Sequence, residues 1–169
     1  LDTGLLMSEI VEETLEGHSI SVLSGPTFAT EVGAGLPSAA SIANQEITTA
    51  RWLASSLGSR NLRLYPTNDL VGVEVSGALK NVIAIACGIS TAKSLGESAR
   101  AALITRGLVE ISRLGVAMGA LEETFCGLCG IGDLVLCCTS PTSRNMALGL
   151  AIGSKIGGIS ETILTEGAY

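Results

Sequence analysis

The chain has 169 residues, of which 47% are hydrophobic but only 3% aromatic, and its formal net charge at pH 7 is −6. The length fits one ordinary domain or two small ones, and the composition predicts an aliphatic core. The negative charge gives no basic field for nucleic acid, and charged residues interrupt every apolar run before the ~18 residues of a membrane span. We therefore expect neither a nucleic-acid partner nor a membrane span.

The cysteines predict free thiols rather than a metal site. There are five of them, an odd number, and the sequence shows no secretory signal, so a reducing cytoplasm is expected. Four lie in two close pairs, Cys126-x-x-Cys129 and Cys137-Cys138, which is a spacing that also permits zinc. Because both pairs lie in apolar, glycine-rich sequence, buried thiols are the favoured interpretation, and we expect no metal.

The first 66 residues alternate between helical and strand patterns. Helices are expected at residues 3–16, 28–32 and 46–57, and strands at 19–23, 38–43 and 61–65. This alternation is typical of an α/β unit with a small sheet. Thr27 is expected to cap the short second helix, so the turn at 24–27 joins a strand to a helix N-terminus. Such turns bind anions in many α/β proteins, although ordinary connections share the pattern.

Beyond residues 66–69 the pattern changes to long helices, expected at 69–92 and 97–118. The first of them carries an apolar stripe at i, i+4 spacing, yet Lys80 lies in its middle. A lysine is rarely buried without a partner, so two interpretations stand. Either the stem is buried while the amine reaches water, or the amine lines a cleft and exchanges protons with a substrate.

Two more charged residues stand out further along the chain. Asp133 lies in an apolar run, so it either caps the helix that begins there or pairs with a buried partner. Arg144 follows Ser140-Pro141, which predicts a helix start with Ser140 as its cap. Since this end of a helix dipole is already positive, Arg144 favours a bound anion, with Ser143 and Asn145 as further donors. A surface carboxylate is the other partner that Arg144 could have.

Six ordered motifs resemble bacterial NAD(P)-dependent glycerol-3-phosphate dehydrogenase. They lie at 23–29 (LSGPTFA), 35–37 (GLP), 77–86 (GALKNVIAIA), 99–107 (ARAALITRG), 130–135 (GIGDLV) and 143–145 (SRN). The resemblance implies an α/β remnant of a Rossmann domain at residues 1–67. It implies an all-α helical domain at 68–169, like the C-terminal domain of 6-phosphogluconate dehydrogenase. It also implies a fragment, because the family's glycine-rich nucleotide motif and its C-terminal tail are not in this sequence.

The resemblance implies a reaction and a set of site residues. The family reduces dihydroxyacetone phosphate to sn-glycerol 3-phosphate, a phospholipid precursor, with NADH or NADPH. Lys80 matches its catalytic proton donor. Substrate contacts are implied for Gly25, Thr27, Lys80, Asp133, Ser143, Arg144 and Asn145, and cofactor contacts for Ala29, Arg144, Leu164 and Glu166. Cys137 stands where the family usually has Thr.

Further expectations follow from the same resemblance: a cytoplasmic location, a homodimer, and no activity of the isolated fragment. Two other functions remain open from the sequence. One is a related dehydrogenase of 3-hydroxy acids or sugar acids with the same architecture, and the other is a non-enzymatic module that binds metal through its cysteines.

Overall fold

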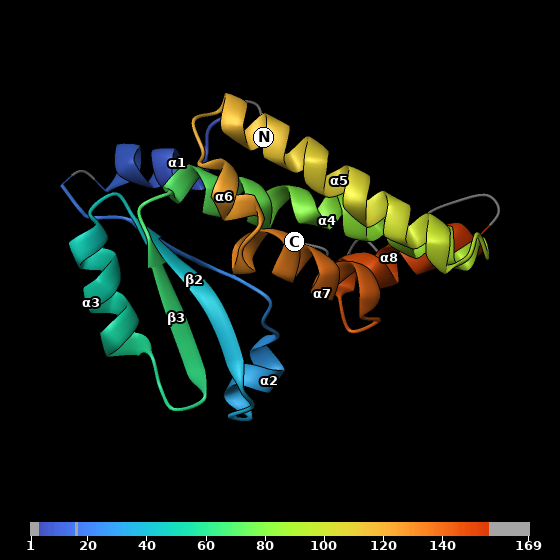
Figure 1. The fold of residues 1–169 in the computed structure, drawn as a ribbon, viewed down its shortest axis with the longest axis horizontal. Helices are drawn as coiled ribbons and strands as arrows, with labels where there is room; N and C mark the ends of the chain where they lie inside the picture. Colours follow the sequence, from blue (N-terminus) through green and yellow to red (C-terminus); the bar gives the residue numbers. More distant parts are fainter. Residues whose placement is uncertain (1–3, 16, 156–169) are drawn as a thin grey trace.

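The computed structural model describes residues 4–15 and 17–155, and Figure 1 shows a small sheet at one end and long helices extending from it. In chain order the elements are α1 (Met7–Thr14), β1 (Ser21–Ser24), α2 (Ala29–Gly33), β2 (Ser38–Asn44), α3 (Ile47–Leu57), β3 (Leu62–Thr67), α4 (Leu70–Ala92), α5 (Glu97–Ala117), α6 (Glu122–Phe125), the π-helix η1 (Leu128–Gly132), α7 (Asp133–Thr139) and α8 (Arg144–Ser154). The architecture confirms the expected α/β remnant followed by a helical region.

The sheet has three strands with β2 in the centre. Strand β1 pairs with β2 in antiparallel orientation, with Ser21 opposite Asn44. Strand β3 pairs with β2 in parallel orientation, and α3 joins these two strands and packs on them. Ala40, Ile42 and Leu64 form the buried cluster between the sheet and α3. The predicted strand–helix–strand unit is therefore present.

Strand β3 extends further than predicted, because it continues through Pro66 to Thr67. Proline has no N–H to donate to a ladder, so the sequence indicated a boundary there. In the described sheet β3 is an edge strand that pairs only with β2, and Pro66 lies opposite Ile42. An edge position tolerates proline because one side of the strand needs no ladder partner.

Three predicted helix starts are wrong in detail. Helix α1 begins at Met7 rather than residue 3, because Leu6 is extended and its N–H donates to Oε2 of Glu9 at 2.6 Å. Helix α2 follows Phe28, and the Thr27 hydroxyl points back to the Gly25 carbonyl at 3.5 Å instead of capping. Helix α8 begins at Arg144, where the Ser143 hydroxyl accepts from the Met146 N–H at 3.4 Å. Ser140 is therefore not its cap.

Helix α4 is the centre of the helical region and packs against α5, α7 and α8. Its contact with α8 is unusually close. A Cβ atom at Gly149 would overlap the carbonyl oxygen of Ile85, and one at Gly88 would overlap that of Met146. Glycine is needed at such backbone-to-backbone contacts. The contact holds the N-terminal end of α8 beside the middle of α4.

By length and composition alone, α4 also qualifies as a membrane-span candidate, which the sequence analysis did not expect. It is 23 residues long with a mean hydropathy of 1.6 in its most apolar window. A central helix of a folded domain has the same properties, and α4 is packed against three other helices. In this structure 39% of that window is buried.

Candidate functional site

The centre of the candidate site is an ion pair between Lys80 on α4 and Asp133, the first residue of α7. Nζ of Lys80 donates to Oδ2 of Asp133. The lysine side chain is 19% exposed and the aspartate side chain only 2%. A lysine ammonium has three N–H donors, so the pair leaves donors that a bound group can use from the exposed side. Asp133 therefore pairs with a partly buried cation and does not cap α7.

A second polar contact adjoins this pair. Nδ2 of Asn145 on α8 donates to Oδ1 of Asn81 at 2.9 Å, and Asn81 directly follows Lys80 on α4. The close packing of α4 and α8 through glycines brings these side chains together although they are 64 positions apart. Ser143 caps α8 and is buried, while Arg144 is exposed at the first position of that helix. The three residues predicted to bind an anion thus lie at the start of a helix, and one of them, Asn145, contacts the residue after Lys80.

The turn after β1 reaches the same region. The hydroxyl of Ser24 would lie 3.3 Å from a Cβ at Gly77, one turn before Lys80. A Cβ at Gly132, directly before Asp133, would lie 3.5 Å from Pro26. Gly25 itself is packed against β2, where a Cβ would lie 2.7 Å from Cα of Ala40. The turn that contains Gly25 and Thr27 therefore packs against α4 at Gly77 and against the start of α7 at Gly132.

Cys137 completes the surroundings of Asp133. It lies one turn further along α7, is buried, and its Sγ donates to Oδ1 of Asp133 at 3.4 Å. Burial raises the pKa of the Cys137 thiol, and the Asp133 carboxylate raises it further, while the Lys80 ammonium lowers it. A thiol with a raised pKa keeps its proton at neutral pH, so it acts here as a hydrogen-bond donor.

Not every predicted residue is brought to this centre. Ala29 is exposed at the first position of α2, and it has no contact with the Lys80–Asp133 pair among those the structure describes. Leu164 and Glu166 lie outside the described residues. The predicted cofactor contacts are thus spread over separate elements, whereas two of the predicted substrate contacts, Lys80 and Asp133, pair directly with each other.

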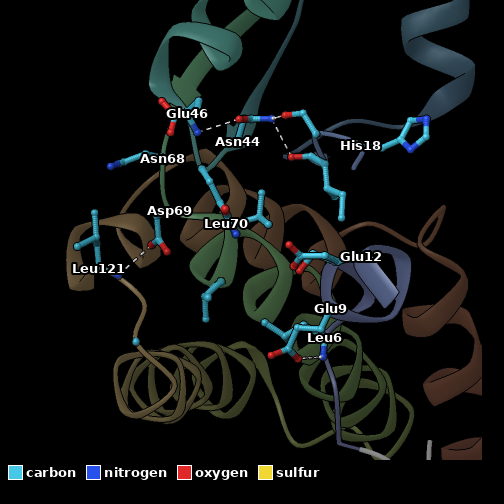
Figure 2. A pocket seen from close by; sticks show the side chains of 16 residues that line it. Leu6, Glu9, Glu12, His18, Asn44, Glu46, Asn68, Asp69, Leu70 and Leu121 are labelled. Carbon is cyan, nitrogen blue, oxygen red and sulfur yellow. Dashed lines mark hydrogen bonds between the residues drawn. The ribbon is translucent and has the colours of Figure 1, made fainter. Parts of the chain in front are cut away.

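Neither Lys80 nor Asp133 lines any of the described cavities. Figure 2 shows one of about 480 Å³ between α1, the β2–α3 turn and the start of α4, lined by Glu9, Glu12, His18, Asn44 and Asp69 among others. Asn44 and Asp69 use their polar atoms in structural bonds there: Asn44 donates to the Ile20 carbonyl at 2.8 Å, and Asp69 accepts from the Leu121 N–H at 2.9 Å. Neither Lys80 nor Arg144 lines this cavity or the two others described over residues 4–155.

The cysteines do not assemble a metal site in the part of the chain that the structure describes, where no three potential ligands among His, Cys, Asp and Glu lie together. Four of the five cysteines are buried and all five are free thiols. The thiols of Cys87 and Cys138 act on each other, which lowers the pKa of Cys87 and raises that of Cys138. These thiols belong to the core between α4 and α7.

Two polar contacts on α4 were not predicted from the sequence. The first is that of Asn81, although an amide in the same apolar stretch as Lys80 was a usable signal. The second is that of Glu74, earlier on α4, which accepts a hydrogen bond from the Ser8 N–H at 2.9 Å and another from the Ser8 hydroxyl. This contact ties α1 to α4, and no local pattern points to a partner 66 positions away.

Comparison with known proteins identifies the family. Residues 1–50 match the family model "NAD-dependent glycerol-3-phosphate dehydrogenase N-terminus", and residues 69–168 match the corresponding C-terminus model. A glycerol-3-phosphate dehydrogenase [NAD(P)+] of Symbiobacterium thermophilum is 54% identical over 98% of this chain and 48% of its own length. One of Agrobacterium fabrum is 49% identical over 99% of this chain and 51% of its own length.

A solved structure agrees with the sequence matches. The crystal structure of glycerol-3-phosphate dehydrogenase from Coxiella burnetii superposes with a TM-score of 0.89 at 44% identity, over 95% of this chain and 49% of that one. The chain therefore spans about half the length of the relatives it matches. With two family models that together match most of its residues, the chain belongs to the NAD-dependent glycerol-3-phosphate dehydrogenase family.

Proposed function

We propose that the whole protein containing this chain reduces dihydroxyacetone phosphate to sn-glycerol 3-phosphate with NADH or NADPH. The observation that carries the proposal is the partly buried Lys80–Asp133 pair, with Asn145 at the start of α8 in contact with the residue after Lys80. Relatives at about 50% identity bear the name of this activity, which supports the same assignment here. The chain spans only half of those relatives, so the proposal concerns the whole protein.

In this proposal Lys80 supplies a proton. When hydride from the nicotinamide reaches a ketone carbon, negative charge develops on the ketone oxygen. An ammonium within hydrogen-bond distance donates its proton to that oxygen, and such general-acid assistance typically contributes about 10²–10⁴-fold. Asp133 holds the ammonium in one orientation, and the partial exposure of the lysine side chain leaves it accessible to a substrate. In the reverse direction the neutral amine takes the proton back.

The start of α8 is proposed to bind the substrate phosphate. Arg144 carries a fork of N–H donors that fits a phosphate, and the N-terminal end of an 11-residue helix adds positive potential. Ser143 and Asn145 add polar donors on either side, and Asn145 is held by Asn81 next to Lys80. Gly25 and Thr27 approach from the other side in the turn after β1. The phosphate of one three-carbon molecule would then lie at the start of α8, and its ketone at the exposed side of Lys80.

The cofactor contacts of Ala29, Arg144, Leu164 and Glu166 remain predictions. The residues present fit only part of a dinucleotide, because the sequence contains no Gly-x-Gly-x-x-Gly after a strand to receive the pyrophosphate. We therefore expect the 169-residue chain alone not to oxidise NADH with dihydroxyacetone phosphate. A cytoplasmic location and a homodimer also remain predictions.

The test is Lys80→Ala in the whole protein. We expect turnover to fall by at least about 10²-fold while cofactor affinity, measured by fluorescence titration of NADH, changes little. Lys93→Ala is the matched control, since Lys93 is an exposed lysine at the C-terminal end of the same helix. Retention of most activity in Lys80→Ala would refute the proton-transfer role. A wild-type protein that prefers carboxylate substrates without phosphate would refute the substrate assignment.

A further inference from the structure

We propose that Cys137 is a positioning residue, which orients the Asp133 carboxylate so that Oδ2 faces Lys80. Its consequence for catalysis rests on the function proposed above, whereas the hydrogen bond itself does not.

The two carboxylate oxygens of Asp133 have different donors. Oδ2 accepts from Nζ of Lys80, which belongs to α4, and Oδ1 accepts from Sγ of Cys137 at 3.4 Å. Because Cys137 is four residues after Asp133, the helical repeat of α7 places both side chains on one face. The thiol is attached to the same rigid helix as the carboxylate. It therefore selects the rotation of the carboxylate independently of where Lys80 lies.

The thiol can serve as a donor only while it is protonated. Burial, followed by the nearby Asp133 carboxylate, raises the pKa of Cys137 above its usual range. The charged or titratable groups that act on this part of α7 are Lys80 and Cys87 of α4, Arg100 of α5, and Asp133 and Cys138 of α7 itself. A thiolate here would face the carboxylate as a like charge, so the S–H form is retained at neutral pH.

The family resemblance places a Thr hydroxyl at this position, and a thiol is a weaker donor of similar size. The Cys137 bond should therefore still orient Asp133, but less strongly than a hydroxyl would. This gives a graded series of variants in which the donor is absent (Cys137→Ala), present as a thiol, or present as a hydroxyl (Cys137→Ser and Cys137→Thr).

The first experiment measures steady-state kinetics of the whole protein. We expect Cys137→Ala to lower kcat about tenfold, as for loss of one hydrogen bond, while the KM for dihydroxyacetone phosphate stays within about twofold. Cys137→Ser should restore kcat to at least the wild-type value. Cys138→Ala is the matched control, because it removes a buried thiol from the next position of α7 without contact to Asp133, and it should leave kcat unchanged. Equal losses in the Ala and Ser variants, or none in either, would overturn the proposal.

The second experiment observes the bond without using activity. The S–H stretching band of Cys137 is obtained by subtracting the infrared spectrum of the Cys137→Ser variant from that of the wild-type whole protein. Asp133→Asn should shift this band toward that of a weaker hydrogen bond, because an amide oxygen is a weaker acceptor than a carboxylate. An unshifted band would overturn the proposal. A shifted band in a protein that does not reduce dihydroxyacetone phosphate would instead refute the proposed function alone.

Discussion

Two buried carboxylates, Asp69 before α4 and Asp133 at the start of α7, show how the same residue type serves different purposes. Asp69 caps α4 and accepts from the N–H groups of Gly72 at 2.8 Å and Leu121 at 2.9 Å, and from the Thr124 hydroxyl at 2.5 Å. Asp133 accepts instead from a lysine and a thiol. Their exposed fractions are 6% and 1%, so burial does not distinguish them.

The donors make the difference. Those of Asp69 are neutral, and two belong to the backbone, so the carboxylate joins α4 to the α5–α6 connection and offers nothing to a ligand. One donor to Asp133 is a flexible, partly exposed ammonium that keeps other N–H groups for a ligand. A buried carboxylate indicates a functional site when its partner is itself able to react.

The largest expected contrast is in turnover of the whole protein. Asp133→Asn should lower kcat by about 10²-fold or more, because Lys80 loses the charge that orients it. Asp69→Asn should leave kcat per folded molecule within about twofold, since Asp69 acts only on the backbone around it. Stopped-flow or steady-state NADH oxidation provides the measurement. Comparable kcat losses in the two variants would remove the distinction between the carboxylates.

The second contrast is in stability. Asp69→Ala should lower the free energy of unfolding by about 3 kcal/mol, because it removes a helix cap and leaves the Leu121 N–H and the Thr124 hydroxyl without their acceptor. Thr124→Val removes only one of the three donors and should cost about 1 kcal/mol. Urea unfolding followed by circular dichroism measures both. If the two variants lost the same amount, Asp69 would not be the common acceptor of this cluster.

A third test asks whether the Lys80–Asp133 pair is needed for folding. Lys80→Met alone should cost about 2 kcal/mol, because it leaves a buried carboxylate unpaired, and partial exposure of the lysine keeps the cost below that of a fully buried pair. The double variant Lys80→Met/Asp133→Leu should recover most of this loss and remain inactive. Recovery of stability without activity would separate folding from function. A double variant less stable than the single one would show a structural role instead.

The smallest expected effect concerns Cys129 of η1, which is influenced by both carboxylates. Burial raises the pKa of its thiol, and the charges of Asp69 and Asp133 add to the increase. Below pH 9.0, the ordinary thiol pKa, folded and unfolded chains both keep the proton. Above it the unfolded thiol ionises first, so the free energy of unfolding should fall by up to about 1.4 kcal/mol per pH unit. Cys129→Ser should flatten this decline in unfolding experiments between neutral and alkaline pH, and an unchanged slope would contradict the assignment.

Much of the fold could be predicted from local sequence patterns. The apolar stripe and polar boundaries predicted α4 and α5 almost to the residue, because long periodic helices carry a strong signal. Helix starts were harder to predict. Ser140 with Pro141 formed a better local start signal than Ser143, yet α8 begins after Ser143. The continuation of β3 through Pro66 depends on its place at the edge of the described sheet, and position in a sheet is not a local property.

The sequence by itself determined the candidates for the site, because a lysine, an aspartate and an arginine in apolar or dipole-opposed surroundings each need a compensating partner. Only the tertiary structure decided what those partners are. Lys80 meets Asp133 across 53 positions, and Asn81 meets Asn145 across 64. The Asn81–Asn145 contact follows from the backbone-close packing of α4 and α8 at Gly88 and Gly149, and the Lys80–Asp133 pair follows from the packing of α7 against α4. The strength of a buried polar contact depends on distances between separate elements, and periodicity along one element contains no information about them.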